Sequence, residues 1–176
     1  MMANAPAEFL THSPEETIAA GRELINRLKP PKIVVLTGDL GAGKTTIIKG
    51  IAEGFKAESQ DNVTSPTFTL IHEYRGPKAT LYHIDLYRVD SARQLETLGI
   101  DDLRDERSLI LLEWGEKFEA LAHTHFEPKA QSPKKPFDSI LPPKTPHFRI
   151  GLTPSFSHPI GALLSASAPS RNIPVQ

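Results

Sequence analysis

A glycine-rich loop after a short apolar run constrains this chain more than any other feature. Residues 38–45, GDLGAGKT, fit the pattern GxxxxGK(S/T), and the apolar run 33–36 before them is typical of a buried strand. Residues 45–55 carry apolar side chains at helical spacing. A strand, a glycine-rich loop and a helix in this order let backbone N–H groups and the positive end of the helix surround phosphate oxygens. We therefore predict a nucleotide-binding site, in preference to a glycine-rich turn without a ligand.

The loop and the first helical residues supply the predicted contacts to the nucleotide. Lys44 has the position from which an ammonium group reaches the outer phosphates. The Thr45 hydroxyl suits Mg²⁺, which prefers oxygen ligands. The predicted nucleotide-binding residues are Asp39, Leu40, Gly41, Ala42, Gly43, Lys44, Thr45 and Thr46.

The composition excludes several classes of protein. The chain has 176 residues, of which 39% are hydrophobic, and this suits one compact domain. No stretch approaches the roughly 20 apolar residues of a membrane span. The first residues lack the basic segment followed by an apolar segment that is typical of a secretory signal. The absence of cysteine excludes disulfides and thiolate metal sites. We therefore expect a cytoplasmic protein without membrane contact.

Proline is concentrated in the last third of the chain and divides the sequence into three parts. Ten of the 16 prolines lie between Pro128 and Pro174, where helical and alternating patterns become rare. We interpret residues 1–122 as the P-loop core and residues 123–146 as a proline-rich insertion or linker. Residues 147–176 are interpreted as a candidate final strand, at 147–152, followed by a loosely ordered tail.

Local patterns in the core predict an α/β fold. A capping box at Ser13 opens a helix through about Lys29, and a second capping box at Ser91 opens a short helix. Two partly alternating stretches, 66–75 and 79–88, flank a Gly-Pro turn and favour an antiparallel hairpin. The continuous apolar run 108–113 is typical of a central parallel strand. The expected architecture is a P-loop NTPase-like three-layer sandwich with a mostly parallel sheet and an antiparallel hairpin.

Two acids are candidates for handling a metal ion or a water molecule at this site. Glu113 ends the apolar run, where parallel sheets present their ligands, although a strand-end carboxylate that faces water is the alternative. Asp85 shares one face of a strand with His83 and Tyr87, a pattern that a solvent-facing edge strand would also show. Arg88 either stabilises charge on a phosphoryl group or forms a surface ion pair.

Taken in order, these motifs resemble those of the TsaE family, also called YjeE. Members of that family are P-loop ATPases required in bacteria for making threonylcarbamoyladenosine in tRNA. The resemblance covers about residues 8–117. It is carried by GDLGAGKTT at 38–46, TSPTF at 64–68, HIDLYR at 83–88, the Leu95-Glu96 segment that ends at Gly99, and LLEW at 111–114.

The resemblance implies binding and slow hydrolysis of ATP with Mg²⁺, in support of a complex of TsaD and TsaB homologues. The chain would then meet tRNA only indirectly, through that complex. By motif, Lys44, Asp85 and Glu113 correspond to the catalytic set, and Thr45 with Glu113 to the metal ligands. Residues 64–68 match a segment likened to a GTPase switch. The chain departs from the family at Gly115, where a proline is usual, and in its C-terminal part.

Two other functions remain open from the sequence. A small-molecule or nucleoside kinase shares the phosphate loop, and Arg104 with Arg107 would then act in its lid. A nucleotide-dependent binding module would use ATP only to order its switch segment. The sequence offers no platform of aromatic and basic residues that would indicate direct tRNA binding.

Overall fold

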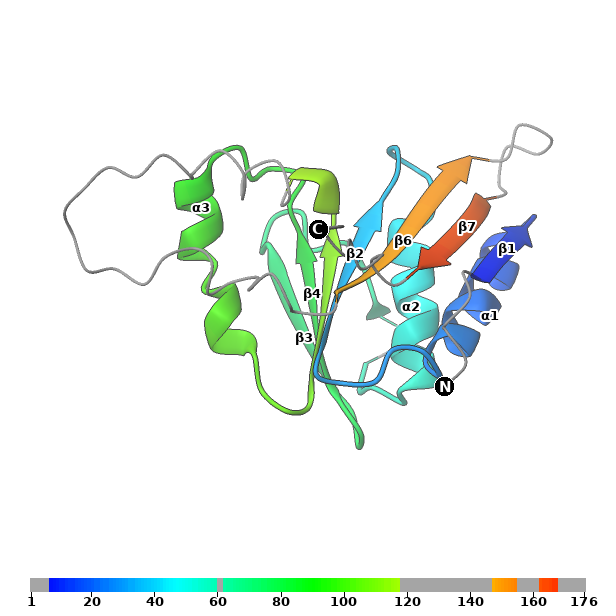
Figure 1. Cartoon of the computed structure of the whole chain (residues 1–176), viewed down its shortest axis with the longest axis horizontal. Coiled ribbons are helices and arrows are strands. Elements are labelled where there is room, and N and C mark those ends of the chain that lie inside the picture. The colour runs from blue at the N-terminus through cyan, green and yellow to red at the C-terminus, as the bar shows by residue number, and fades with distance from the viewer. Residues whose placement is uncertain (1–6, 60–61, 118–146, 155–161, 168–176) are drawn as a thin grey trace, which may run out of the picture.

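A seven-stranded sheet runs through the part of the chain that the computed structural model describes, namely residues 7–59, 62–117, 147–154 and 162–167. Its strands lie in the order β1-β7-β6-β2-β5-β4-β3 (Figure 1). They are β1 (Ala7–Thr11), β2 (Lys32–Thr37), β3 (Ile71–Arg75), β4 (Thr80–Asp85), β5 (Ser108–Glu113), β6 (His147–Pro154) and β7 (Ala162–Ser167).

The centre of the sheet is parallel. β2 pairs in parallel with β5 and β6, and β5 pairs in parallel with β4. β3, β7 and β1 join at the edges by antiparallel pairing. All six side chains of β5 are buried, because apolar residues fill both faces of a strand that lies inside the sheet. The predicted α/β fold is confirmed, and β3 and β4 form the predicted antiparallel hairpin.

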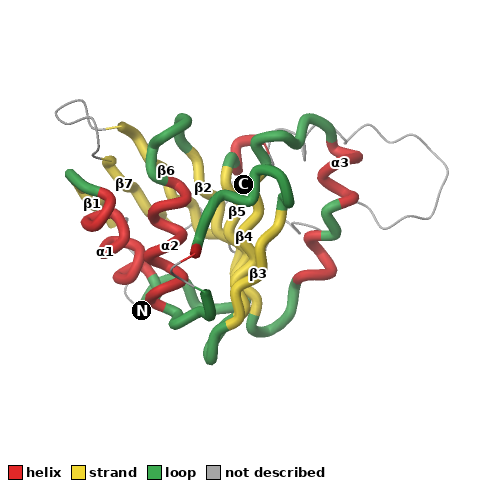
Figure 2. The backbone as a smooth tube through the Cα atoms, turned by 180° about the vertical axis from the view of Figure 1, so that it is seen from behind, coloured by secondary structure: helices red, strands yellow, loops and turns green. Residues whose placement is uncertain are grey.

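Helices on both faces complete the three layers. One buried cluster joins Val34 of β2 to Leu111 of β5 under α1 and α2, and a second joins Ile33 to Leu112 under α3 and η2. Figure 1 shows α3 on the opposite side of the sheet from α1 and α2, and Figure 2 shows the same layers from behind. The helices are α1 (Pro14–Leu24), α2 (Lys44–Gly54), α3 (Ala92–Thr97) and the 3₁₀ helix η2 (Ile100–Leu103).

Both predicted helix starts carry side-chain caps. The Ser13 hydroxyl accepts a hydrogen bond from the Glu16 N–H at 3.2 Å. The Ser91 hydroxyl accepts from the Gln94 N–H at 3.3 Å, and the Gln94 side chain accepts from the Ser91 N–H at 3.2 Å. These bonds satisfy N–H groups that have no partner inside a helix. The predicted capping box is complete at Ser91, whereas at Ser13 only the cap by the hydroxyl forms, because the Glu16 carboxylate accepts from the His12 N–H at 2.7 Å instead.

The first helix is shorter than the sequence predicts. The prediction extends to Lys29, whereas α1 ends at Leu24. After it, the backbone closes tighter turns, in which the Arg27 N–H bonds the Leu24 carbonyl at 2.8 Å and the Leu28 N–H bonds the Ile25 carbonyl at 3.2 Å. This tightening brings the chain to the Pro30-Pro31 pair, where no helix can continue.

The predicted strand over 66–75 is only half formed. β3 begins at Ile71, and the residues before it make a turn closed by the Leu70 N–H and the Pro66 carbonyl at 2.6 Å. Hydroxyl groups in this turn bond to Asp85 on the neighbouring strand. The segment therefore contributes side chains to the site, and only its last residue, Leu70, accepts a backbone bond from β4, from the Asp85 N–H at 3.0 Å.

Three strands complete the sheet from the two ends of the chain. β6 includes the predicted strand at 147–152 and continues to Pro154, but it is not the final strand, because β7 lies within the stretch that the sequence predicts to be a loosely ordered tail. β1 and β7 have no counterpart in the predictions; they pair with each other across most of the chain length. The predicted insertion at 123–146 lies outside the described residues. Within the described ranges, no helix is long and apolar enough to cross a bilayer.

Two glycines bring α1 and α2 into close contact. A Cβ atom added at Gly50 would lie 2.1 Å from the Ile18 carbonyl oxygen, and one at Gly21 would lie 2.5 Å from the Ile47 carbonyl oxygen. Only glycine allows the two backbones to approach so closely. Since α2 starts at Lys44, this crossing fixes the helix that carries the phosphate loop.

Candidate functional site

A cavity of about 380 Å³ opens where the parallel strands β2, β4 and β5 end. Of the predicted nucleotide-binding residues, only Asp39 and Ala42 are absent from its wall. Ala42 is buried in the core, and its N–H bonds the Asp39 carbonyl at 3.1 Å. The wall is made by Leu40, Gly41, Gly43, Lys44, Thr45, Thr46, Ser65, Thr67, Asp85, Tyr87, Glu113 and Trp114.

The backbone of the loop is shaped by glycines and supported by β6. Gly38 has a φ of 134°, and a Cβ atom there would lie 2.3 Å from the Leu152 carbonyl oxygen. Gly43, with a φ of 95°, directly precedes α2. The loop therefore curls against the final parallel strand, and its amides lie at the start of a helix, where anions bind.

Lys44 is held at the centre of this loop. Its Nζ donates to the carbonyl oxygens of Gly38 at 2.6 Å and Asp39 at 2.8 Å, and it lies 3.9 Å from the centroid of the Trp114 ring. Burial lowers the pKa of the Lys44 ammonium, and the negative charge of Glu113 is the largest opposing influence. A desolvated cation in this position attracts a phosphate more strongly than a hydrated surface lysine would.

Glu113 is 3% exposed at the end of β5, so the interpretation as a water-facing strand end is wrong. Its Oε1 accepts from the Thr45 hydroxyl at 2.7 Å and from His83 Nε2 at 2.9 Å. The two predicted metal ligands, which are far apart in sequence, are thus in direct contact. The sequence places His83 on the polar face of this strand and assigns it no role.

Asp85 is 2% exposed, and β4 lies between β5 and β3, so the interpretation as a solvent-facing edge strand is wrong. Its Oδ2 accepts from the hydroxyls of Ser65 at 2.5 Å and Thr67 at 2.8 Å. Its Oδ1 accepts from the Tyr87 N–H at 2.9 Å. The sequence predicts that the hydroxyls of 64–68 reach a phosphate or its metal, whereas in this structure they bind the acid.

Trp114 covers one side of the cavity, a role that the sequence alone weighs below simple packing. Its backbone has a φ of 60°, an uncommon value for a non-glycine residue that is found preferentially at functional sites. Its ring lies 5.1 Å from that of Tyr87, between centroids. Lys117 Nζ donates to the Tyr87 carbonyl and to Asp90 Oδ1, which fixes the turn after β4 that carries Tyr87.

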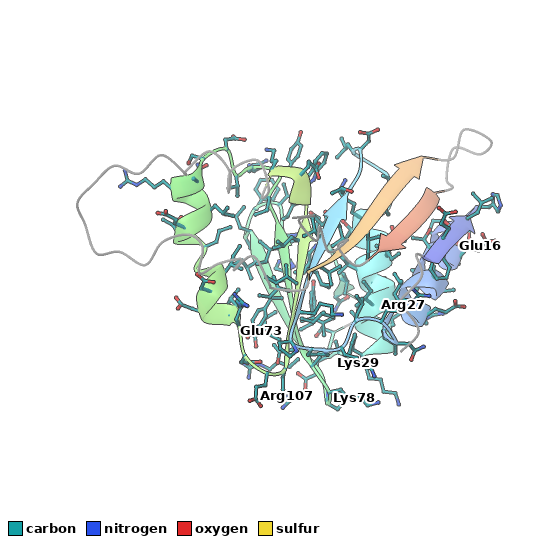
Figure 3. The ribbon with its side chains drawn as sticks, in the orientation of Figure 1. Glu16, Arg27, Lys29, Glu73, Lys78 and Arg107 are labelled. Carbon is teal, nitrogen blue, oxygen red and sulfur yellow. The ribbon has the colours of Figure 1, made fainter. Side chains whose placement is uncertain are left out.

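The three arginines for which the sequence suggests a role do not line the cavity. The Arg88 guanidinium lies 4.4 Å from the centroid of the Phe68 ring, and Arg88 does not line the cavity. Arg107 donates to the Gly76 and Pro77 carbonyls in the turn between β3 and β4, and Figure 3 shows it beside Lys78 at the lower end of the strands. Arg104 lies near Asp101. Neither Arg104 nor Arg107 lines the cavity.

Comparison with known proteins gives the chain a family. The family model described as "Threonylcarbamoyl adenosine biosynthesis protein TsaE" matches residues 11–135. A protein of Aquifex aeolicus named "tRNA threonylcarbamoyladenosine biosynthesis protein TsaE" is 38% identical over 110 residues, which are 62% of this chain and 77% of that protein. The protein of the same name from Bacillus subtilis is 42% identical over 112 residues, 64% of this chain and 68% of the relative. For Haemophilus influenzae the values are 44% over 97 residues, 54% of this chain and 60% of the relative, which is less than two thirds of its length.

A solved structure shows the same fold. The crystal structure of Bacillus subtilis YdiB superposes with a TM-score of 0.61 and 27% sequence identity, covering 93% of this chain and 85% of YdiB. The family match spans most of the described core, including the phosphate loop, Asp85 and Glu113. On the motifs, the fold and the family match together, this chain belongs to the TsaE family.

Proposed function

We propose that this chain binds ATP, hydrolyses it slowly by itself, and supports the threonylcarbamoyladenosine modification of tRNA together with homologues of TsaB and TsaD. The observation that carries the proposal is one cavity whose wall contains Lys44, Thr45, Asp85 and Glu113. A phosphate loop beside two buried acids is the set that phosphoryl transfer to water requires. The role in tRNA modification is inferred from the names of the relatives.

The cavity wall offers the oxygen donors that magnesium prefers. The Thr45 hydroxyl and the Glu113 carboxylate lie 2.7 Å apart, and Mg²⁺ is typically held by one or two such groups together with phosphates and water. Thr45 and Glu113 would hold the ion. When bound, magnesium would neutralise negative charge that develops on the phosphate oxygens during transfer.

Asp85 and the hydroxyls of 64–68 are suited to sense the nucleotide. Ser65 and Thr67 both donate to Asp85, and both line the cavity. A phosphate oxygen would compete with Asp85 as the acceptor for these hydroxyls, so the segment can exchange partners when the nucleotide changes. Asp85 is then free to orient the attacking water.

Exposed apolar side chains beside the cavity suit a partner protein. Leu40 and Tyr87 lie in the wall and are 78% and 46% exposed, and Phe68 is 83% exposed. Large apolar groups gathered at the mouth of a site are typical of interaction surfaces. We assign this surface to the TsaB–TsaD partner, which would reach the nucleotide through it.

The experiment compares the wild type with Lys44→Ala and Asp85→Asn. Calorimetry measures ADP and ATP binding with Mg²⁺, and phosphate release is followed with and without the TsaB and TsaD homologues. We expect the wild type to bind both nucleotides, to hydrolyse ATP slowly alone, and to gain activity with the partners. Asp85→Asn should still assemble but lose about 100-fold or more in hydrolysis, the usual contribution of a general base. Asp102→Asn, an exposed carboxylate on η2, is the matched control.

Three outcomes would contradict this proposal. Full activity without partners would argue against a role within a complex. Normal tRNA modification by Asp85→Asn would indicate a binding module without useful hydrolysis. Transfer of labelled γ-phosphate to a small metabolite would indicate a kinase.

A further inference from the structure

His83 is fully buried in β4, yet only one of its two ring nitrogens has a hydrogen-bond partner among the described residues. Nε2 lies 2.9 Å from Glu113 Oε1, whereas Nδ1 is buried without a partner. Buried polar atoms are nearly always paired, so an orphaned nitrogen in the core calls for an explanation. An aliphatic side chain would fill the same space without leaving a nitrogen unpaired. The contact with Glu113 is therefore the reason to look for a function of this ring.

The sheet register explains why His83 can reach Glu113. β4 and β5 are parallel neighbours, and His83 lies opposite Leu111 while Asp85 lies opposite Glu113. The Glu113 carboxylate thus reaches back along its strand to the imidazole. Because a carboxylate only accepts, the hydrogen is on Nε2.

The Glu113 carboxylate is held from two sides. Thr45 donates to the same Oε1 at 2.7 Å, from the first turn of α2. Two donors from different elements restrict the rotation of the carboxylate more than Thr45 alone would. His83 does not line the cavity, and its side-chain hydrogen bond goes to Glu113, so Glu113 links it to a ligand there.

We infer that His83 is a positioning residue, which orients Glu113 so that the carboxylate and the Thr45 hydroxyl together receive magnesium with the nucleotide. This inference rests on the proposed function, because it requires a nucleotide and metal site. Groups that orient the ligands of a metal typically change its affinity by about 10- to 100-fold when they are removed. The effect should appear in metal-dependent binding and be absent from metal-free nucleotide binding.

The test uses the full chain and measures ADP affinity by calorimetry, once with Mg²⁺ and once with a chelator. His83→Leu removes the donor and fills the core, whereas His83→Gln restores an N–H at the position of Nε2. Leu81→Val, on the same strand and the same face, controls for disturbance of the core. We expect His83→Leu to lower the Mg²⁺ affinity of the ADP complex about 10- to 100-fold while its metal-free ADP affinity is unchanged. His83→Gln and Leu81→Val should remain close to the wild type.

A second comparison tests the inference without relying on His83→Leu in the wild-type background alone. In a Glu113→Gln background, His83→Leu should have little further effect, because the group it orients has lost its charge. If His83→Leu does not fold, His83→Asn replaces it, since its amide is too short to reach Glu113 and Gln is the matched long amide.

The possible results separate the two ideas. A wild type that binds no nucleotide overturns the proposed function and this inference with it. A wild type that binds ADP more tightly with Mg²⁺, with His83→Leu showing the same gain, overturns only the inference. Equal losses with and without Mg²⁺ would also overturn it, because they would indicate a structural role.

Discussion

At the scale of single residues, the cavity depends on polar side chains that are buried and paired. Lys44, Asp85 and Glu113 are each at most 5% exposed, and each makes at least two hydrogen bonds. Their presence could be predicted, because the motif spacing and the strand ends are local signals. Their partners could not, because Ser65 meets Asp85 and Thr45 meets Glu113 only after the strands have paired.

Tyr74 gives a prediction at this scale. Burial raises the pKa of its hydroxyl above 10.0, and Tyr74 is 7% exposed. Between about pH 10 and the raised pKa, the unfolded tyrosine is ionised while the folded one keeps its proton, so the unfolding free energy falls as the pH rises. The wild type should lose up to about 1.4 kcal/mol per pH unit in this window relative to Tyr74→Phe.

Urea denaturation of both proteins at about pH 8 and about pH 10.5 measures this difference. At about pH 10.5 the wild type should have lost unfolding free energy relative to Tyr74→Phe, compared with the difference between the two proteins at about pH 8. Parallel losses of stability in the alkaline range would show that Tyr74 ionises as freely in the folded protein as in the unfolded one.

At the scale of elements, the glycine contact between α1 and α2 sets the position of the phosphate loop. Gly50→Ala would place a methyl group 2.1 Å from the Ile18 carbonyl oxygen. We expect a loss of about 1–3 kcal/mol in unfolding free energy, as for overpacked cores, and weaker ADP binding because α2 begins at Lys44. Lys49→Ala on the same helix should change stability by no more than about 0.5 kcal/mol. Chemical denaturation measures the unfolding free energy, and titration measures the ADP affinity. If Gly50→Ala is less stable but binds ADP as the wild type does, the contact between α1 and α2 does not control the site.

The turn after β5 offers a second prediction for an element. A Cβ atom at Gly115 would lie 2.0 Å from Val35 Cγ1, which explains why this chain has no larger residue there. Gly115→Ala should therefore cost about 1–3 kcal/mol. When Gly115→Ala is combined with Val35→Ala, the loss of unfolding free energy should be smaller than the sum of the two single losses by about 0.5–3 kcal/mol. The control is Val34→Ala, on the other face of β2, with which the losses should be additive. A double-mutant cycle by denaturation measures the coupling, and additive losses with Val35→Ala would refute the steric explanation.

At the scale of the whole molecule, β6 completes the core. Ile150 and Leu152 of β6 are fully buried, and β6 pairs with β2 along the edge that residues 1–122 alone would expose. In a chain ending at residue 122, the absence of these two side chains should reduce the unfolding free energy by about 3–6 kcal/mol. Its Tm should fall by about 10 °C or more, and it should bind ADP weakly.

A chain ending at residue 167 retains β6 and β7 and provides the control for this truncation. Thermal unfolding followed by circular dichroism compares the two shortened chains with the full one. If residues 1–122 unfold at the temperature of the full chain, β6 is dispensable for the core.

The sequence alone predicted the elements whose signals lie within a few residues: the phosphate loop, the two capped helices, the buried strand over 108–113 and the hairpin. It failed where contacts join distant segments, as in the pairing of β1 with β7 and the bonds of residues 64–70 to Asp85. Caps, turns and hydrophobic periods act through neighbouring residues, so they can be recognised in one dimension. Which strands become neighbours, and so which buried acid meets which hydroxyl or imidazole, depends on how the whole sheet packs. The sequence motifs therefore determine which chemistry the site can support. Its geometry is determined by the register between the strands and by the packing of the phosphate loop against β6.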